Sequence, residues 1–121
     1  SADNLWPTRG SMRSNVYFIM MVVHTVLDND KQALTMLGDF RDNYSDWIYV
    51  ENYLPDIVGL EKIYPDKPAL AVQRGRFHQW VNDYRGAREA YEDAMAHDDL
   101  SKSWRTAATM WKMETAPAVV P

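Results

Sequence analysis

The sequence predicts an all-α protein with a single domain. Apolar residues recur every three or four positions along most of the chain, which is the spacing of one face of a helix. Prolines and short clusters of Asn, Asp and Ser separate these periodic segments, as expected at the ends of helices. Two runs rich in β-branched residues, 16–26 and 47–50, lack the turn residues of a hairpin, so no strand is expected.

The composition excludes several classes of protein. With 121 residues, of which 46% are apolar and 25% charged, the chain fits one globular domain and is neither disordered throughout nor a multi-span membrane protein. The 13 Lys and Arg residues are outnumbered by 17 Asp and Glu residues, and the net charge of −4 argues against nucleic acid as a partner. Because the chain has no cysteine, a disulfide, a thiolate nucleophile and a zinc-finger site are excluded.

The two ends of the chain lack helical periodicity. Residues 1–12 include a Gly-Ser-Met triple that resembles an expression scar, so we expect a tag or a disordered leader there. Residues 116–121 contain two prolines and are expected to form a flexible tail. The single helical domain is therefore expected to cover residues 13–115.

An apolar run at residues 16–23 forms the centre of the first predicted helix, 14–27, which has Ser14 or Asn15 as its N-cap. The run is shorter than the roughly 20 residues that a bilayer-spanning helix needs. In an alternative interpretation, residues 12–27 act as a secretory signal, and the protein is secreted or attached to a membrane. No small-x-small cleavage site follows the run, so we expect a buried helix in a cytoplasmic protein.

The remaining helices are predicted from their caps and prolines. The second helix begins at Asp30, and the third follows a cap at Ser45. Pro55 lies within the apolar pattern of the third helix. Because proline removes a backbone donor and crowds the preceding turn, we expect a break or kink there and a separate short helix, 55–64. Further helices are predicted at 68–81, 84–97 and 102–114, separated by an Asn82–Asp83 turn and by a cap at Ser101.

Small and aromatic residues recur at fixed positions between residues 68 and 101. Counted from Pro68, the eighth, twentieth and twenty-seventh positions are the small residues Gly75, Ala87 and Ala94, and Tyr84 and Tyr91 are aromatic. In this pattern the segment resembles a tetratricopeptide repeat, a 34-residue helix–turn–helix unit.

The match is incomplete. Four positions depart from the family pattern, where Ala71, Arg74, His78 and Asp99 replace its usual Trp, Leu, Tyr and Pro. Residues 14–47 resemble a degenerate second copy, aligned through Ala33. The resemblance implies antiparallel helix–turn–helix pairs with right-handed superhelical packing, and the alternative is an unrelated helical bundle.

The small residues also predict a contact on physical grounds. Glycine inside a helix costs about 1 kcal/mol relative to alanine, so Gly75 indicates a close approach between two helices. Ala87 and Ala94 are two helical turns apart and would let the paired helix approach to about 8–10 Å. We therefore expect these three positions to meet at one helix–helix contact.

The resemblance implies a ligand groove lined by the first helix of each unit. Position by position, the groove residues would be Ala69, Val72, Arg76, Gln79 and Trp80, with Asn15, Phe18, Val22, Thr25 and Val26 from the degenerate copy. The six that we predict to bind the partner are Phe18, Val22, Val72, Arg76, Gln79 and Trp80. Arg76 and Trp80 are the expected hot spots, and the alternative for Trp80 is a place in the core.

The function implied is a non-enzymatic protein–protein interaction module, such as an adaptor, a chaperone or an assembly subunit. It would bind a protein segment that has apolar anchors and an acidic residue for Arg76. Trp104 and Trp111 would close the repeat as a lid.

The first helix suggests a different mode of binding. Because residues 16–23 are apolar on all sides, other helices or another molecule must cover both faces. We predict self-association through Met20 and Met21, since methionine adapts to irregular surfaces, and we expect a homo-oligomer. The alternative function is a non-catalytic structural subunit of a larger complex that docks through this helix.

The sequence contains no recognisable catalytic or metal-binding motif. None of the three histidines follows the Glu-x-x-His pattern of di-iron bundles, and there is neither a His-Glu-x-x-His motif nor a glycine-rich phosphate loop. We therefore predict no enzyme activity, catalytic residue, metal or cofactor. A small enzyme or ligand-binding bundle built around an aromatic pocket is a third alternative. A basic and aromatic stretch could grip an acidic peptide or stack bases; its arginines are Arg74, Arg76, Arg85 and Arg88.

Overall fold

A computed structural model describes residues 12–116 of the chain. These residues form six α-helices and no strand: α1 (Met12–Val26), α2 (Asp30–Tyr44), α3 (Trp47–Ile63), α4 (Ala69–Trp80), α5 (Tyr84–Met95) and α6 (Lys102–Glu114). The all-α prediction is confirmed. The expectations for residues 1–11 and 117–121 lie outside the described residues, and α1 begins at Met12, the last residue of the expected leader.

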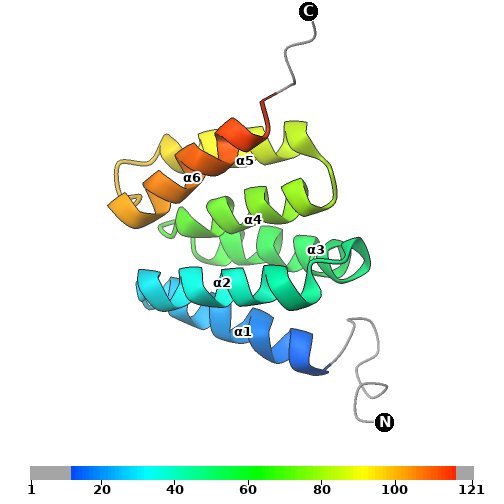
Figure 1. Ribbon diagram of the computed structural model, residues 1–121. Helices are drawn as coiled ribbons and strands as arrows, with labels where there is room; N and C mark the ends of the chain where they lie inside the picture. Colours follow the sequence, from blue (N-terminus) through cyan, green and yellow to red (C-terminus); the bar gives the residue numbers. More distant parts are fainter. Residues whose placement is uncertain (1–11, 117–121) are drawn as a thin grey trace, which may run out of the picture.

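Consecutive helices run antiparallel and stack in one direction, with α1 at one end of the stack and α5 and α6 at the other (Figure 1). The central helix is α4, which contacts α1, α3, α5 and α6. Eight of its twelve residues are buried, including five in a row from Ala69 to Gln73. Because five consecutive residues point in all directions around a helix, α4 is covered on every side near its N-terminus.

Aromatic side chains hold the first four helices together. Phe18 of α1 stacks on Tyr53 of α3 with ring centroids 4.4 Å apart, and Phe40 of α2 stacks on Phe77 of α4 at 5.2 Å. All four side chains are at most 6% exposed. Ring pairs of this kind contribute about 0.5–1.5 kcal/mol each beyond the burial of their surface, so this cluster fixes α1 to α4 in one core.

The predicted close approach of α4 and α5 is confirmed. Ala87 and Ala94 are fully buried on α5, and a Cβ atom built on Gly75 of α4 would lie 2.5 Å from Cε1 of Tyr91. No side chain larger than glycine fits there without a shift of the ring. The sequence therefore identified the tightest helix pair from its small residues alone.

α3 passes through Pro55 without ending, so the predicted separate helix 55–64 is wrong. The proline has no N–H to donate to the carbonyl of Glu51, a defect that costs about 3 kcal/mol inside a helix. Val50, Tyr53 and Ile57 lie on both sides of it on one face, and each is at most 1% exposed. Burial of such side chains contributes about 1.5–3 kcal/mol each, which is enough to keep the helix continuous.

Some of the predicted helix caps are wrong. Because α1 begins at Met12, Ser14 and Asn15 lie within the helix and are buried. The N-cap of α3 is Asp46 and not Ser45. The cap at Ser101 is confirmed, since its hydroxyl accepts a hydrogen bond from the Trp104 backbone N–H at 3.3 Å.

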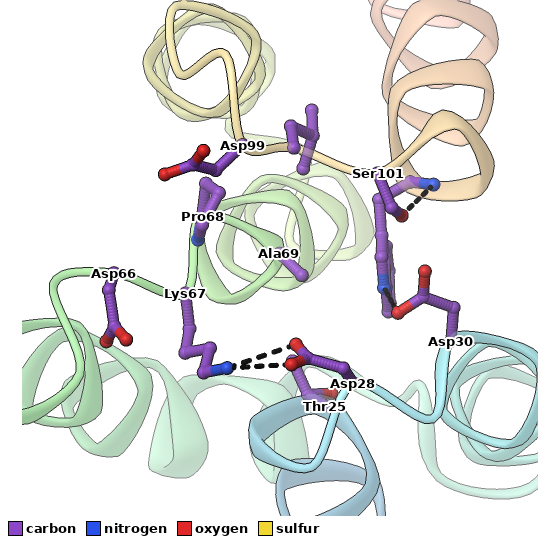
Figure 2. Close-up of a pocket in the computed structure, with 11 residues that line it drawn as sticks. Thr25, Asp28, Asp30, Asp66, Lys67, Pro68, Ala69, Asp99 and Ser101 are labelled. Carbon is purple, nitrogen blue, oxygen red and sulfur yellow. Dashed lines mark hydrogen bonds and ion pairs between the residues drawn. The ribbon is translucent and has the colours of Figure 1, made fainter.

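The N-terminal ends of α2, α4 and α6 meet beside the turn that follows α1, around a surface cavity of about 350 Å³ (Figure 2). Trp104 of α6 donates from its indole Nε1 to Asp30 Oδ1 of α2 at 3.2 Å, and its side chain is 1% exposed. Lys67 donates to both carboxylate oxygens of Asp28, at 3.1 and 2.9 Å, and this hydrogen bond raises the pKa of Lys67. These contacts tie α6 and the α3–α4 connection to the first helical hairpin, so α6 closes the stack as expected for Trp104.

Candidate interaction surfaces

The six residues predicted to bind a partner do not form an open groove. Phe18 is 6% exposed and Val72 is 0% exposed, so both are core residues and the prediction that they touch a partner is corrected. Val22 and Trp80 are partly buried against the same core. The reason is that Phe18 packs on Tyr53 and Phe77, and Trp80 packs on Phe40, so these positions belong to the shared core of the first four helices.

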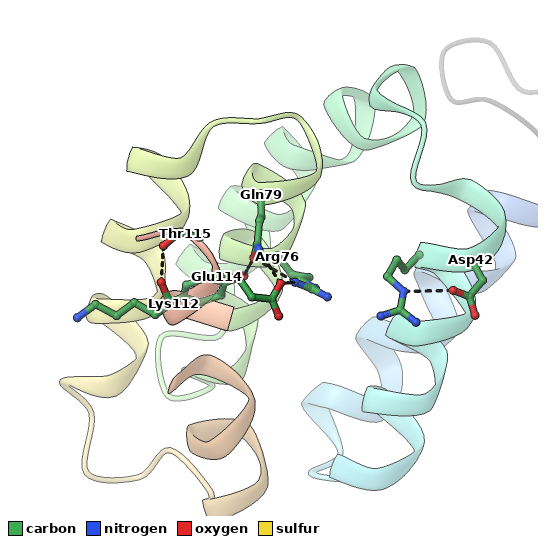
Figure 3. A network of polar contacts seen from close by, with 8 residues as sticks. Asp42, Arg76, Gln79, Lys112, Glu114 and Thr115 are labelled. Carbon is green, nitrogen blue, oxygen red and sulfur yellow. Dashed lines mark hydrogen bonds and ion pairs between the residues drawn. The ribbon is translucent and has the colours of Figure 1, made fainter. Parts of the chain in front are cut away.

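Arg76 and Gln79 of α4 belong to a partly buried network with Tyr91 of α5 and Glu114 of α6, which we call the Arg76 cluster. Figure 3 shows Arg76, Gln79 and Glu114. Arg76 donates from Nη1 to Oε1 of Gln79 at 3.1 Å and to Oε1 of Glu114 at 3.0 Å. The amide of Gln79 donates to the same Glu114 oxygen at 2.9 Å, and the hydroxyl of Tyr91 donates to Gln79 Oε1 at 2.8 Å. Burial raises the pKa of the Tyr91 phenol, which keeps it in the donating form.

The guanidinium of Arg76 is also enclosed by aromatic rings. Its Cζ lies 4.4 Å from the ring centroid of Trp111 and 5.8 Å from that of Trp80, and the residue is only 7% exposed. The acidic residue that was expected to come from a partner is thus supplied by Glu114 of the same chain. An outside carboxylate would have to displace it.

Trp80 remains accessible in part. Its ring lies parallel to that of Phe40, with centroids 6.2 Å apart and an interplanar angle of 12°, and it is partly buried. Stacking therefore fixes the ring on one side while part of its surface faces solvent. This is the one predicted hot spot that the structure leaves open to contact.

The most exposed apolar surface with a regular pattern lies on α1. Four side chains of α1 and that of Leu27, the first residue after the helix, make up this surface, which we call the α1 outer face: Val16, Ile19, Met20, Val23 and Leu27, exposed by 46, 53, 43, 48 and 62%. They recur at intervals of three and four residues, and they lie opposite the buried side chains of Phe18, Met21 and Thr25. Since α1 is an end helix of the stack, no other described helix covers this face.

Met20 and Met21 lie on opposite sides of α1. Met20 belongs to the α1 outer face, whereas Met21 is 0% exposed and packs in the core. The prediction that Met21 contacts a second molecule is therefore corrected. Four members of the face, Val16, Ile19, Val23 and Leu27, were not selected from the sequence, because an uninterrupted apolar run does not show which side faces inward.

Exposed apolar side chains elsewhere are interrupted by charge. Ile48 and Val58 of α3 are 57 and 40% exposed, but Glu51 and Lys62 share that side of the helix and are exposed as well. The α1 outer face contains no charged residue among its five members.

Two negative findings bear on the site. The described residues contain no group of three or more His, Cys, Asp or Glu side chains that could hold a metal ion. Among residues 12–116, no helix is both long enough and apolar enough to cross a bilayer.

Comparisons with known proteins give no match, whether with family models, curated proteins or solved structures.

Proposed function

We propose that this protein is a non-enzymatic protein-interaction module that docks through the α1 outer face. The observation that carries the proposal is the exposure of five apolar side chains on one side of an end helix, each between 43 and 62%. The largest apolar patch on the surface of a soluble protein is often an interaction site. This function corresponds to the docking subunit that the sequence offered as an alternative.

Two observations favour this surface over the groove of α1 and α4 as the binding site. Phe18 and Val72 are inaccessible, and Arg76 already has Glu114 as its acidic partner. Binding of a segment in the groove would require both helices to separate and the Arg76 cluster to open.

We also propose that α4 and α5 form a tetratricopeptide-like unit, with α1 and α2 as a second hairpin of the same type. The contact of Gly75 with Tyr91 and the burial of Ala87 and Ala94 support this assignment. Helical repeats of this kind act as binding scaffolds and seldom as enzymes, which agrees with the proposed function.

A matched pair of double variants tests the docking surface. Ile19→Lys with Val23→Lys places two charges on the α1 outer face, and Ile63→Lys with Val58→Lys places the same changes on α3, where the two side chains are 67 and 40% exposed. Both double variants should fold, because the replaced side chains are exposed. A protein that binds the wild-type chain and the α3 variant, but not the α1 variant, supports the proposal. Equal binding to both double variants refutes it.

Segment binding around Trp80 is a second candidate, favoured by the partial exposure of a ring that is stacked on Phe40. In that case Trp80→Ala abolishes binding of a peptide with apolar anchors, and Ile19→Lys with Val23→Lys leaves it unchanged. The opposite pattern, with binding that survives Trp80→Ala, rejects this candidate.

A further inference from the structure

We infer that the α1 outer face binds a second copy of this chain, with the two α1 helices packed antiparallel about a two-fold axis. The inference rests on the proposed function, since it names the occupant of the same surface. Three observations on this face support it: the spacing of its side chains, the charges at its two ends, and its area.

The spacing is that of a helix–helix seam. Val16, Met20, Val23 and Leu27 follow one another at intervals of four, three and four residues, which is the alternation of the two core positions in a heptad. If the helices run antiparallel, Val16 of one copy faces Leu27 of the other and Met20 faces Val23, in both directions. Every member of the seam then has an apolar partner.

The charges at the ends of α1 favour the antiparallel orientation. Arg13 is exposed near the N-terminus of α1, and Asp28 and Asp30 follow its C-terminus. Asp28 is already paired through both carboxylate oxygens with Lys67, and Asp30 accepts from Trp104, so the orientation depends on Arg13. An antiparallel pair keeps the two exposed Arg13 side chains at opposite ends of the seam, whereas a parallel pair places Arg13 against Arg13.

The area agrees with a reversible dimer. The five exposed side chains form a patch of roughly 450 Å² about 16 Å long, which lies within the roughly 300–600 Å² of the largest apolar patch on a monomer, a patch that is often functional. Two copies would together bury about 900 Å² of seam, and the flanking side chains bring this near the roughly 1,000 Å² of a specific interface. We therefore expect a dimer that dissociates on dilution.

The chain's own N-terminal segment is less suited than a second copy to cover the α1 outer face. Residues 1–11 contain Leu5 and Trp6 as large apolar side chains, which are too few to cover five exposed positions. A second copy supplies five matching side chains from an already formed helix. Isologous pairing of this kind is the commonest form of protein self-assembly.

Sedimentation equilibrium of the full chain tests the pairing. Between about 1 and 500 µM, the wild type should shift from monomer to dimer. Ile19→Lys with Val23→Lys should weaken the dimer at least about 100-fold, because it would place two like charges in the seam, at position 23 of each copy, and two more beside it, at position 19. The control, Ile63→Lys with Val58→Lys, should dimerise as the wild type does. A wild type that stays monomeric over this range, or a dimer that both double variants form equally, overturns the inference.

Single cysteines test the orientation, since the natural chain has none. In an antiparallel pair of Val16→Cys proteins, position 16 of one copy is too far from position 16 of the other to form a disulfide, which needs Cα atoms within about 7 Å. A mixture of Val16→Cys and Leu27→Cys proteins should cross-link under mild oxidation. Efficient cross-linking of Val16→Cys with itself, and none in the mixture, overturns the antiparallel arrangement. These variants keep apolar surfaces, so the test does not depend on the folding of the lysine variants.

The two failures can be told apart. If the chain is monomeric, but a different protein binds it and the double variant Ile19→Lys with Val23→Lys abolishes that binding, the pairing with a second copy is refuted and the proposed function stands. If the chain is monomeric and no binding responds to this double variant, both are refuted.

Discussion

Gly75→Ala tests the closest contact between α4 and α5. A Cβ atom at this position would lie 2.5 Å from Cε1 and 2.6 Å from Cδ1 of Tyr91, about 1 Å inside the normal separation of two carbon atoms. The ring cannot turn away easily, because Tyr91 is 0% exposed and its hydroxyl donates to Gln79 at 2.8 Å. The added methyl group and the ring therefore cannot both keep their places.

Two effects of opposite sign determine the size of the change. Alanine is more favourable than glycine inside a helix by about 1 kcal/mol. Overpacking of a buried contact costs about 1–3 kcal/mol, and the upper end applies where the neighbouring side chain is held in place. We expect Gly75→Ala to lower the free energy of unfolding by about 1–2 kcal/mol, which lowers the Tm by about 4–8 °C.

Gly38 and Gly59 provide matched controls for helix propensity. A Cβ atom at either position meets no heavy atom within 4 Å, so Gly38→Ala and Gly59→Ala should raise stability by up to about 1 kcal/mol. Thermal and urea unfolding followed by circular dichroism measures all three variants. Removal of part of the ring by Tyr91→Leu should reduce the cost of Gly75→Ala by at least about 0.5 kcal/mol in a double-mutant cycle. A Gly75→Ala protein as stable as the wild type would refute the tight contact.

Three further predictions concern the polar contacts, and each is checked by urea unfolding. Glu114→Ala should lower the free energy of unfolding by about 1–3 kcal/mol, because it removes an acceptor from the buried Arg76. Glu114→Gln keeps an oxygen there and should cost less. Equal losses of stability in the two variants would contradict this. Trp104→Phe removes the hydrogen bond to Asp30 and leaves a small cavity, so the free energy of unfolding should fall by about 1–3 kcal/mol. An unchanged stability would show that this contact does not hold α6 in place. The raised pKa of Tyr91 means that the folded state keeps the phenol proton after the unfolded chain has lost it, so stability should fall above about pH 10. Tyr91→Phe should reduce this alkaline slope, and an unchanged slope would exclude Tyr91 as its cause.

Local patterns were enough to predict most of the fold. Helix type follows from the apolar period, and the contact at Gly75 follows from the unfavourable placement of glycine inside a helix. Pro55 was misjudged because a local rule was applied without its tertiary context. Burial of Val50, Tyr53 and Ile57 on both sides of the proline exceeds the cost of the missing hydrogen bond, and such burial depends on helices that are distant in the sequence.

The candidate surfaces were predicted less well, for a related reason. Arg76 was expected to await an acidic partner, but Glu114 lies 38 positions away in the sequence and reaches it only after α6 folds back on α4. In the first helix, the apolar run gives no indication of the inward side. Polarity does not mark the outer side of this helix either, because Ser14 and Thr25 are buried, where Ser14 bonds Tyr53 and Thr25 bonds Gln73.

The two ends of the helical stack differ in a way that bears on assembly. At one end, α6 turns Trp104, Ala107 and Ala108 inward and presents mainly polar residues such as Lys102 and Thr106 to solvent, with Met110 and Met113 as exceptions. A terminal helix with a polar outer side ends a stack of helices. At the other end, the outer side of α1 is apolar and not polar. The outer side of α6 is therefore mixed, whereas that of α1 is apolar, and an antiparallel copy of α1 would cover the apolar end without adding any other element.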